Sequence, residues 1–295
     1  MPISFKPGRA HSQMAAGLAG LAGLRRFAFP AQAGGRRLAI ALAASSLLGA
    51  CAMSPSRAPV AASRLDAVQA AGVLRICTPG DYKPFSFQKP DAGYEGIDID
   101  LMDAFGKSLA AKPEYVKTTW ANLLPDLSAG KCDIAVGGVS VTTDRQKKAF
   151  FSAPYMVNGK TPIARCADVA KYQTVADIDK PTTRVIFNPG GSNERFARAN
   201  FKQARMTLHG ENITIFDEIL ANRADVFVTE SAEAITQQKL KPGLCAINPD
   251  KPLQYGEMGW MLPRDDMAFK AYVDQWLHLA QAGGEFQKVM DKWLK

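Results

Sequence analysis

The segment from Cys132 to Tyr155 places a cationic side chain in a setting suited to an anion. Its apolar run at 133–138 ends in two glycines and predicts a buried parallel strand. Thr143 with Gln three places later resembles a capping box, so Arg145 falls in the first turn of a helix. Helix N-termini and guanidinium groups both bind anions. We therefore expect a carboxylate-binding site here, against the alternative of an Arg on a solvated helix face.

Other groups suited to ligand binding follow the ends of predicted strands. They are Asp81, Tyr82, Trp120, Gly138, Ser140, Gly191, Ser192, Asn193, Glu230 and Glu233, and Lys160 lies in a segment expected to cross between two modules. Parallel α/β sheets bind ligands beyond the carboxyl ends of their strands, so these residues should line one cleft. Cationic donors, aromatic faces and carboxyl groups together suit a small organic acid with a ring. For Glu233, the alternative is a solvated helix carboxylate.

Several other chemistries lack their motifs. No Ser-His-Asp set or phosphate loop is present, and the adjacent Gly190 and Gly191 lack the spacing of a dinucleotide fingerprint. The histidines His11, His209 and His278 are scattered and no CxxC pair exists, which argues against zinc. We expect no metal and no cofactor.

The elements that position these residues alternate between strands and helices. Strands are expected at 73–77, 114–118, 133–138, 184–188, 205–208 and 225–229, with amphipathic helices between them. This pattern predicts an α/β fold of two lobes, each a doubly wound sheet, with crossings near 158–163 and 257–262. Two crossings imply a two-strand hinge and a cleft. The aromatic stripes of the last two helices are expected to be core.

The net charge of +8 is concentrated at the start of the chain. Residues 1–50 carry six Lys or Arg and no Asp or Glu, so the remainder is close to neutral and a nucleic-acid partner is not supported. Leu38 to Ala50 is a 13-residue apolar stretch of signal-peptide length, and Leu48 to Cys51 resembles a lipobox. We expect an exported, periplasmic protein whose one membrane contact is a lipid at Cys51. Cleavage near Ala50 without lipidation is the alternative, and Met14 is an alternative start.

The predicted division of the chain follows from these features. It comprises a signal peptide at 1–50, a flexible tether at 51–64, a first lobe from 65–161 and 258–295, and a second lobe at 162–257. Export permits disulfides. Cys166 and Cys245 lie near the two ends of the second lobe and are expected to be bonded, whereas Cys77 and Cys132 are expected to be buried thiols.

The lobes resemble periplasmic amino-acid-binding proteins of ABC transporters, a type II binding-protein fold with two mixed sheets. The shared features are the GG-S-x-T-x-x-R run and the FSxPY motif, here Phe151 to Tyr155. Within that fold the chain is more similar to the cyclohexadienyl dehydratases, through the segments 80–85, 159–163, 188–200, 212–216, 230–234 and 272–279. The similarity covers nearly everything from Arg64 to Leu294.

This resemblance implies an enzyme of phenylalanine biosynthesis, a carbon–oxygen lyase. It would convert prephenate to phenylpyruvate and arogenate to phenylalanine by loss of water and CO2. It also implies that Glu233 is the general acid and that Lys160, Asn193, Trp120 and Arg145 line the site. Aromatisation drives the reaction, so no cofactor is implied. Glu230 departs from the Asp that these enzymes usually carry, which leaves the preference between the two substrates open.

We assign Arg145, with Ser140 and Gly138, to the substrate carboxylate that is retained, because a tight grip on the leaving carboxylate would stabilise the ground state. Lys160 and Asn193 would orient the other end of the substrate. Glu233 must keep its proton at a helix N-terminus, so desolvation has to outweigh the helix dipole. The alternative function is a non-catalytic amino-acid-binding lipoprotein of an ABC transporter. The oligomeric state, including a homo-oligomer, stays open.

Overall fold

The computed structural model describes residues 63–295. The expected signal peptide at 1–50 and the lipidation site Cys51 lie outside these residues. Of the tether expected at 51–64, the structure describes only Ser63 and Arg64, and Arg64 begins helix α1, which runs to Ala71. Ser63 caps this helix, and its hydroxyl accepts a hydrogen bond from the N–H of Leu65 at 3.1 Å.

The first lobe is built on a five-stranded mixed sheet. Its strands are β1 (Val73–Thr78), β5 (Lys112–Lys117), β6 (Ile134–Ala135), β7 (Phe150–Phe151) and β14 (Met261–Leu262), in the order β5-β1-β6-β14-β7. Its helices are α1, α2 (Ile97–Ser108), α3 (Leu123–Ser128), α4 (Thr143–Gln146), α9 (Met267–Ala282) and α10 (Glu285–Leu294). Strands β1, β5 and β6 are parallel, and β14 runs antiparallel to β6 and β7. A small sheet of β2 (Asp81–Tyr82), β3 (Ser86–Gln88) and β4 (Tyr94–Glu95) lies beside it.

The second lobe has a six-stranded mixed sheet. Its strands are β8 (Met156–Arg165), β9 (Arg184–Phe187), β10 (Arg205–Leu208), β11 (Val226–Glu230), β12 (Leu244–Ala246) and β13 (Gln254–Met258). Its helices are α5 (Val175–Ile178), α6 (Ser192–Asn200), α7 (Ile215–Leu220) and α8 (Ser231–Leu240), with 3-10 turns η1 (Cys166–Lys171) and η2 (Asn212–Thr214). Strands β9, β10 and β11 are parallel, and β8 is antiparallel to its neighbours. Both sheets are therefore mixed, as the sequence predicted.

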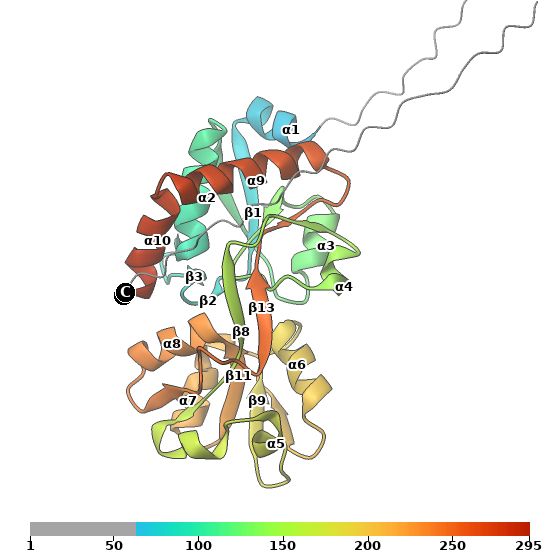
Figure 1. Cartoon of the computed structure of the whole chain (residues 1–295). Helices are drawn as coiled ribbons and strands as arrows, with labels where there is room; N and C mark the ends of the chain where they lie inside the picture. The colour runs from blue at the N-terminus through green and yellow to red at the C-terminus, as the bar shows by residue number, and fades with distance from the viewer. Residues whose placement is uncertain (1–62) are drawn as a thin grey trace, which may run out of the picture. The chain divides into compact units, whose positions relative to one another are not determined.

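Strands β8 and β13 link the two lobes. They pair antiparallel from Gln254 opposite Lys160 to Met258 opposite Met156, and Figure 1 shows them passing side by side from one lobe to the other. Two chain crossings of this kind form a two-strand hinge. The predicted lobe boundaries at 161–162 and 257–258 fall within or at the end of these strands and stay a prediction.

Each lobe has its own hydrophobic core. The first includes the fully buried Phe105 and Trp260, and the second includes Phe187, Phe216 and Phe227. Helix α9 begins at Met267 behind the capping carboxylate of Asp266 and buries one face in the first core. The aromatic stripes of α9 and α10 are thus core, as predicted.

Two disulfides cross-link the chain. Cys166 and Cys245 are bonded, with their Cα atoms 4.8 Å apart. The prediction that Cys77 and Cys132 are free thiols is wrong, because they form the other disulfide, with Cα atoms 5.6 Å apart. Cys77 ends up beside Cys132 because β1 and β6 are parallel neighbours and Cys132 lies just before β6. Sequence spacing alone does not show that strand order.

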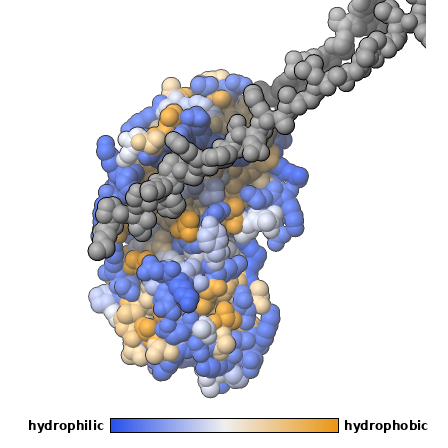
Figure 2. Space-filling model, in the orientation of Figure 1, coloured by the Kyte–Doolittle hydropathy of each residue, from blue (hydrophilic) through white to orange (hydrophobic). Residues whose placement is uncertain are grey.

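The face of the protein that Figure 2 shows is mainly hydrophilic, with apolar residues in small separate patches. Among residues 63–295, no helix combines the length and hydrophobicity that crossing a bilayer requires.

Candidate active site

Arg145 lies on α4, shortly after the end of β6. The predicted cap Thr143 is wrong by one residue: Thr142 is the N-cap, and its hydroxyl accepts from the N–H of Arg145 at 3.3 Å. Arg145 is only 7% exposed, which rules out a solvated position. Its Nη1 donates to the carbonyl of Ser140 at 2.8 Å, and within the described part of the chain it has no carboxylate partner. Burial, followed by repulsion from Arg195, lowers its pKa to about 10. An anion would relieve both effects.

The loop before Arg145 is held by a buried carboxylate, that of Asp98. It accepts hydrogen bonds from the N–H groups of Gly137 and Gly138, both at 2.7 Å. The hydroxyl of Tyr155 and the indole N–H of Trp260 donate to it as well, at 3.1 and 3.0 Å. The N–H of Gly138 is therefore already engaged, so Gly138 lines the cleft without offering a donor to a ligand.

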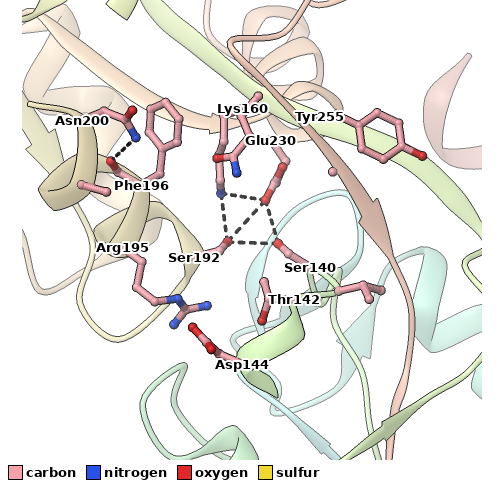
Figure 3. A pocket seen from close by; sticks show the side chains of 14 residues that line it. Ser140, Thr142, Asp144, Lys160, Ser192, Arg195, Phe196, Asn200, Glu230 and Tyr255 are labelled. Carbon is pink, nitrogen blue, oxygen red and sulfur yellow. Dashed lines mark hydrogen bonds and ion pairs between the residues drawn. The ribbon is translucent and has the colours of Figure 1, made fainter. Parts of the chain in front are cut away.

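Lys160 and Glu230 form a buried ion pair in the second lobe. They lie directly opposite each other on β8 and β11, with Nζ and Oε1 2.7 Å apart, and are 6% and 3% exposed. Ser140 and Ser192 also donate to Glu230, at 2.7 and 3.3 Å (Figure 3). Burial opposes ionisation of Glu230, but the Lys160 ammonium and these hydroxyls outweigh it and lower its pKa. Glu230 is therefore an anion with its charge matched.

Glu233 lies in the first turn of α8 and is 1% exposed, which rules out a solvated helix carboxylate. Its partners are uncharged: the Thr229 hydroxyl bonds Oε2, and the Asn212 amide donates to Oε1 at 3.3 Å. Burial raises its pKa well above the usual value. The hydrogen bond from Thr229 lowers the pKa by less than burial raises it, and the charge of Asp81 raises it further. Desolvation thus outweighs the helix dipole. The carboxyl group is held neutral in a position suited to a general acid.

Asp81, Tyr82 and Trp120 form the first-lobe side of the cleft. The indole N–H of Trp120 donates to the Asp81 carboxylate at 2.9 Å, and its ring meets that of Tyr82 edge-on. Burial raises the pKa of Asp81 to about 6. The side chains of residues 63–295 contain only two buried polar atoms without a hydrogen-bond partner, Tyr82 Oη and Asn212 Oδ1.

Direct hydrogen bonds join the two lobes across the cleft. Ser140 donates to Glu230 and lies 3.0 Å from the Ser192 hydroxyl, and Asn212 donates to the main-chain carbonyl of Asp81 at 3.0 Å. A cavity of about 10 Å³, one water in size, remains between Tyr82, Trp120 and Asn193. Larger cavities of about 300 and 370 Å³ flank it. The small cavity between the lobes has no room for a ring, so a ligand that occupied it would have to displace these interlobe bonds.

Most of the predicted site residues line these cavities, whereas Arg145 and Glu233 lie behind their walls, Arg145 bonded to the Ser140 carbonyl and Glu233 to Asn212. Gly191 lines the small cavity with Ser192 and Asn193, and its Cα–H face lies against Trp120. Thr229 and Asn212 were missed by the sequence analysis. Both could have been found from their position in the sequence. Thr229 immediately precedes Glu230, and Asn212 is the first residue of one of the segments that carry the family resemblance. Within residues 63–295, no cluster of His, Cys, Asp and Glu could hold a metal ion.

Comparison with known proteins places this cleft in a family. Residues 74–295 match the bacterial extracellular solute-binding proteins, family 3. Cyclohexadienyl dehydratase of Pseudomonas aeruginosa is 45% identical over 88% of this chain and 95% of its own. The crystal structure of an ancestral cyclohexadienyl dehydratase is 49% identical, covers 80% of this chain and 98% of that one, and has a TM-score of 0.51. The ancestral amino acid-binding protein described as its precursor is 33% identical, covers 79% and 100%, and has a TM-score of 0.74.

The family match spans both lobes and the hinge, and the sequence similarity to dehydratases exceeds that to the precursor binding protein. The chain therefore belongs to family 3 of the bacterial extracellular solute-binding proteins.

Proposed function

We propose that this protein is a cyclohexadienyl dehydratase that converts prephenate to phenylpyruvate, and arogenate to phenylalanine. The observation that carries the proposal is Glu233, a fully buried carboxyl group surrounded by uncharged donors in the cleft between the lobes. A protein that only binds amino acids has no use for an acid of this kind. The 45% identity to the Pseudomonas aeruginosa dehydratase supports the same conclusion.

The reaction needs one proton and no oxidant. Glu233 protonates the ring hydroxyl of prephenate, the C–O bond breaks, and water leaves. The bond to the ring carboxylate breaks at the same stage, CO2 departs, and its electron pair completes the aromatic ring. Glu233 then takes a proton from solvent to restore the acid. General acid catalysis of this kind contributes about 10²–10⁴ in rate.

The remaining groups suit the two carboxylates of the substrate. Arg145 is a buried cation without a counter-ion, and we assign it to the side-chain carboxylate that the product keeps. Lys160 and Asn193 would orient the ring end. Tyr82 Oη and Asn212 Oδ1, the two unpartnered polar atoms near Glu233, are free to bond the departing hydroxyl. Because Lys160 already neutralises Glu230, the site lacks an unpaired anion there for an α-ammonium group, which favours prephenate.

The family consists of extracellular proteins, so the chain is exported. We propose in addition a periplasmic location and a lipid at Cys51, which mass spectrometry of the mature protein would test. The lyase class follows from the dehydration itself.

A prephenate assay tests the function. The purified protein at neutral pH should produce phenylpyruvate, and Glu233→Gln should lower kcat about 10²–10⁴-fold with the fold intact by circular dichroism. Glu285→Gln is the matched control, because Glu285 also lies in the first turn of a helix but is exposed. Its activity should equal that of the wild type.

No turnover of prephenate or arogenate above the uncatalysed rate would overturn the proposal. Tight binding of an amino acid in calorimetry without turnover would then support the transport function.

A further inference from the structure

A continuous line of hydrogen bonds connects Lys160 to Glu233 inside the second lobe. The ammonium of Lys160 donates to Asn193 Oδ1 at 2.5 Å, and Asn193 Nδ2 donates to Thr229 Oγ1 at 3.2 Å. The Thr229 hydroxyl bonds Oε2 of Glu233. All four side chains are at least 94% buried, so water does not compete for these bonds.

The chemistry of the groups fixes the direction of every bond in this line. An ammonium can only donate, so Asn193 must turn its carbonyl oxygen toward Lys160. Its NH2 group then faces Thr229, whose hydroxyl oxygen accepts. The single hydroxyl proton of Thr229 is left to be donated, and Oε2 of Glu233 is its acceptor. A reversed amide would place donors against the ammonium.

The other oxygen of Glu233 faces a different environment. Asn212 Nδ2 donates both to Oε1 at 3.3 Å and to the main-chain carbonyl of Asp81, which belongs to the opposite lobe. Oε1 is therefore the oxygen on the cleft side. Oε2 is held within the second lobe by Thr229, which lies on the same sheet as Lys160.

We propose that Thr229 is a positioning residue for the general acid: by donating to Oε2 it leaves the transferable proton on Oε1, where the substrate hydroxyl arrives. This inference rests on the proposed dehydration. Asn193 and Thr229 lie in the second lobe and Lys160 pairs with Glu230 in its sheet, so the arrangement does not depend on contacts with the first lobe. Closure adds the bond between Asn212 and Asp81.

The charged and titratable groups that face Glu233 come from two strands. They are Asp81 and Tyr82 on β2 and Glu230 at the end of β11, and Lys160 on β8 pairs with Glu230. Burial, Asp81 and Glu230 raise the pKa of Glu233, whereas the bond from Thr229 lowers it. Removal of the Thr229 hydroxyl should therefore raise the pKa further while releasing the carboxyl group from its fixed orientation.

Thr229→Val tests the assignment, with Thr229→Ser as rescue and Thr161→Val as matched control. Thr161 lies directly opposite Thr229 in the sheet, is equally buried, and bonds Ser231 instead of Glu233. Thr229→Val should lower kcat about 10–100-fold, the equivalent of one or two hydrogen bonds, with KM nearly constant. The alkaline limb of its pH profile should move to higher pH, because the acid keeps its proton longer.

Thr229→Ser should restore both the rate and the pH profile, whereas Thr161→Val should lose stability without moving the alkaline limb. A loss of kcat no larger than in Thr161→Val, or an unmoved limb, would overturn the role of Thr229. So would a serine variant that behaves like valine.

A measurement without turnover separates this inference from the proposed function. In protein labelled with ¹³C at the Glu carboxyl carbons, the resonance absent from Glu233→Gln belongs to Glu233. Its titration should move to higher pH in Thr229→Val and stay in place in Thr161→Val. An inactive wild type with this shift would refute the dehydration and keep the hydrogen-bond assignment, and an active enzyme without the shift would refute the assignment alone.

Discussion

Glu230 and Glu233 are two carboxyl groups three residues apart, both buried, with opposite ionisation. Glu230 contacts the Lys160 ammonium and two serine hydroxyls, and its pKa lies below the usual value. Glu233 contacts a threonine and an asparagine, and its pKa lies well above it. Exposure does not distinguish them, at 3% and 1%.

This difference shows that burial sets the size of the desolvation cost, and that a nearby counter-charge decides whether the pKa of the buried carboxyl group is lowered or raised. One cation on β8 is within reach of Glu230, and Asn193 lies between that cation and Glu233. The same lobe thus holds one glutamate whose pKa is lowered and another whose pKa is raised.

Lys160→Met should remove the difference in pKa between Glu230 and Glu233, because it leaves Glu230 buried without its counter-charge. The free energy of unfolding should fall by about 3–5 kcal/mol in urea denaturation at pH 7. The matched control is Lys147→Met, because Lys147 pairs with Asp144 at the surface, where both side chains are more than 70% exposed. That pair should contribute under about 1 kcal/mol.

The double variant Lys160→Met with Glu230→Gln should recover part of the loss, because neither partner is then left charged and alone. Equal destabilisation by Lys160→Met and Lys147→Met would contradict the account of Glu230.

The stability of Glu233→Gln relative to the wild type should increase as the pH rises. Folding raises the pKa of Glu233, so the native state keeps a proton that the unfolded state loses above its usual pKa near 4.5. Wild-type stability therefore falls as the pH rises through that value, until the folded pKa is reached. Each unit of raised pKa costs about 1.4 kcal/mol.

Urea denaturation from pH 4 to pH 8.5 measures this effect. Glu230→Gln should show no such trend over this range, since the stability that the lowered pKa of Glu230 adds is fully present above its usual pKa near 4.5 and is lost only as the pH falls below that value toward the folded pKa. A constant offset between Glu233→Gln and the wild type at every pH would show that Glu233 is not held neutral.

Gly190→Ala should reduce the difference in pKa between Glu230 and Glu233, because it keeps the lobes apart and admits water to Glu233. Gly190 has a φ of +80°, and a Cβ there would lie 2.7 Å from the backbone nitrogen of Ala121 in the opposite lobe. We expect kcat/KM to fall about tenfold, a cost of about 1.4 kcal/mol in the transition state, and the radius of gyration in X-ray scattering to increase.

Gly284→Ala isolates the backbone strain, because Gly284 has a φ of +82° and nothing within 4 Å of its added Cβ. It should lose stability without loss of activity. If both variants lose activity equally, the contact between Gly190 and Ala121 does not control closure.

Much of the fold could be predicted because it follows from local patterns. Alternating apolar strands and amphipathic helices gave both lobes, and the strand at 205–208 was placed to the residue. Short irregular features were less predictable. The cap of α4 is Thr142 and not the predicted Thr143, because neighbouring hydroxyl residues offer equivalent caps in sequence.

The site could be predicted from the sequence only as a set of candidate residues. Strand ends and the family resemblance indicated Arg145, Lys160 and Glu233, and their roles stay a prediction. The hydrogen bond from the Gly138 N–H to Asp98 could not be predicted, because 40 residues separate the two along the chain. The same holds for Asn212, which reaches Asp81 across 131 residues.

From the sequence alone, the two-lobe α/β plan and the bonded pair Cys166–Cys245 could be predicted, because periodicity, strand ends and motifs are local or family-wide properties. Only the tertiary structure decided that Cys77 and Cys132 are bonded, that Glu230 is charged and that Glu233 is neutral. Those outcomes depend on which groups meet across strands and lobes, since the ionisation of a buried group follows from its neighbours in space and from the water they exclude.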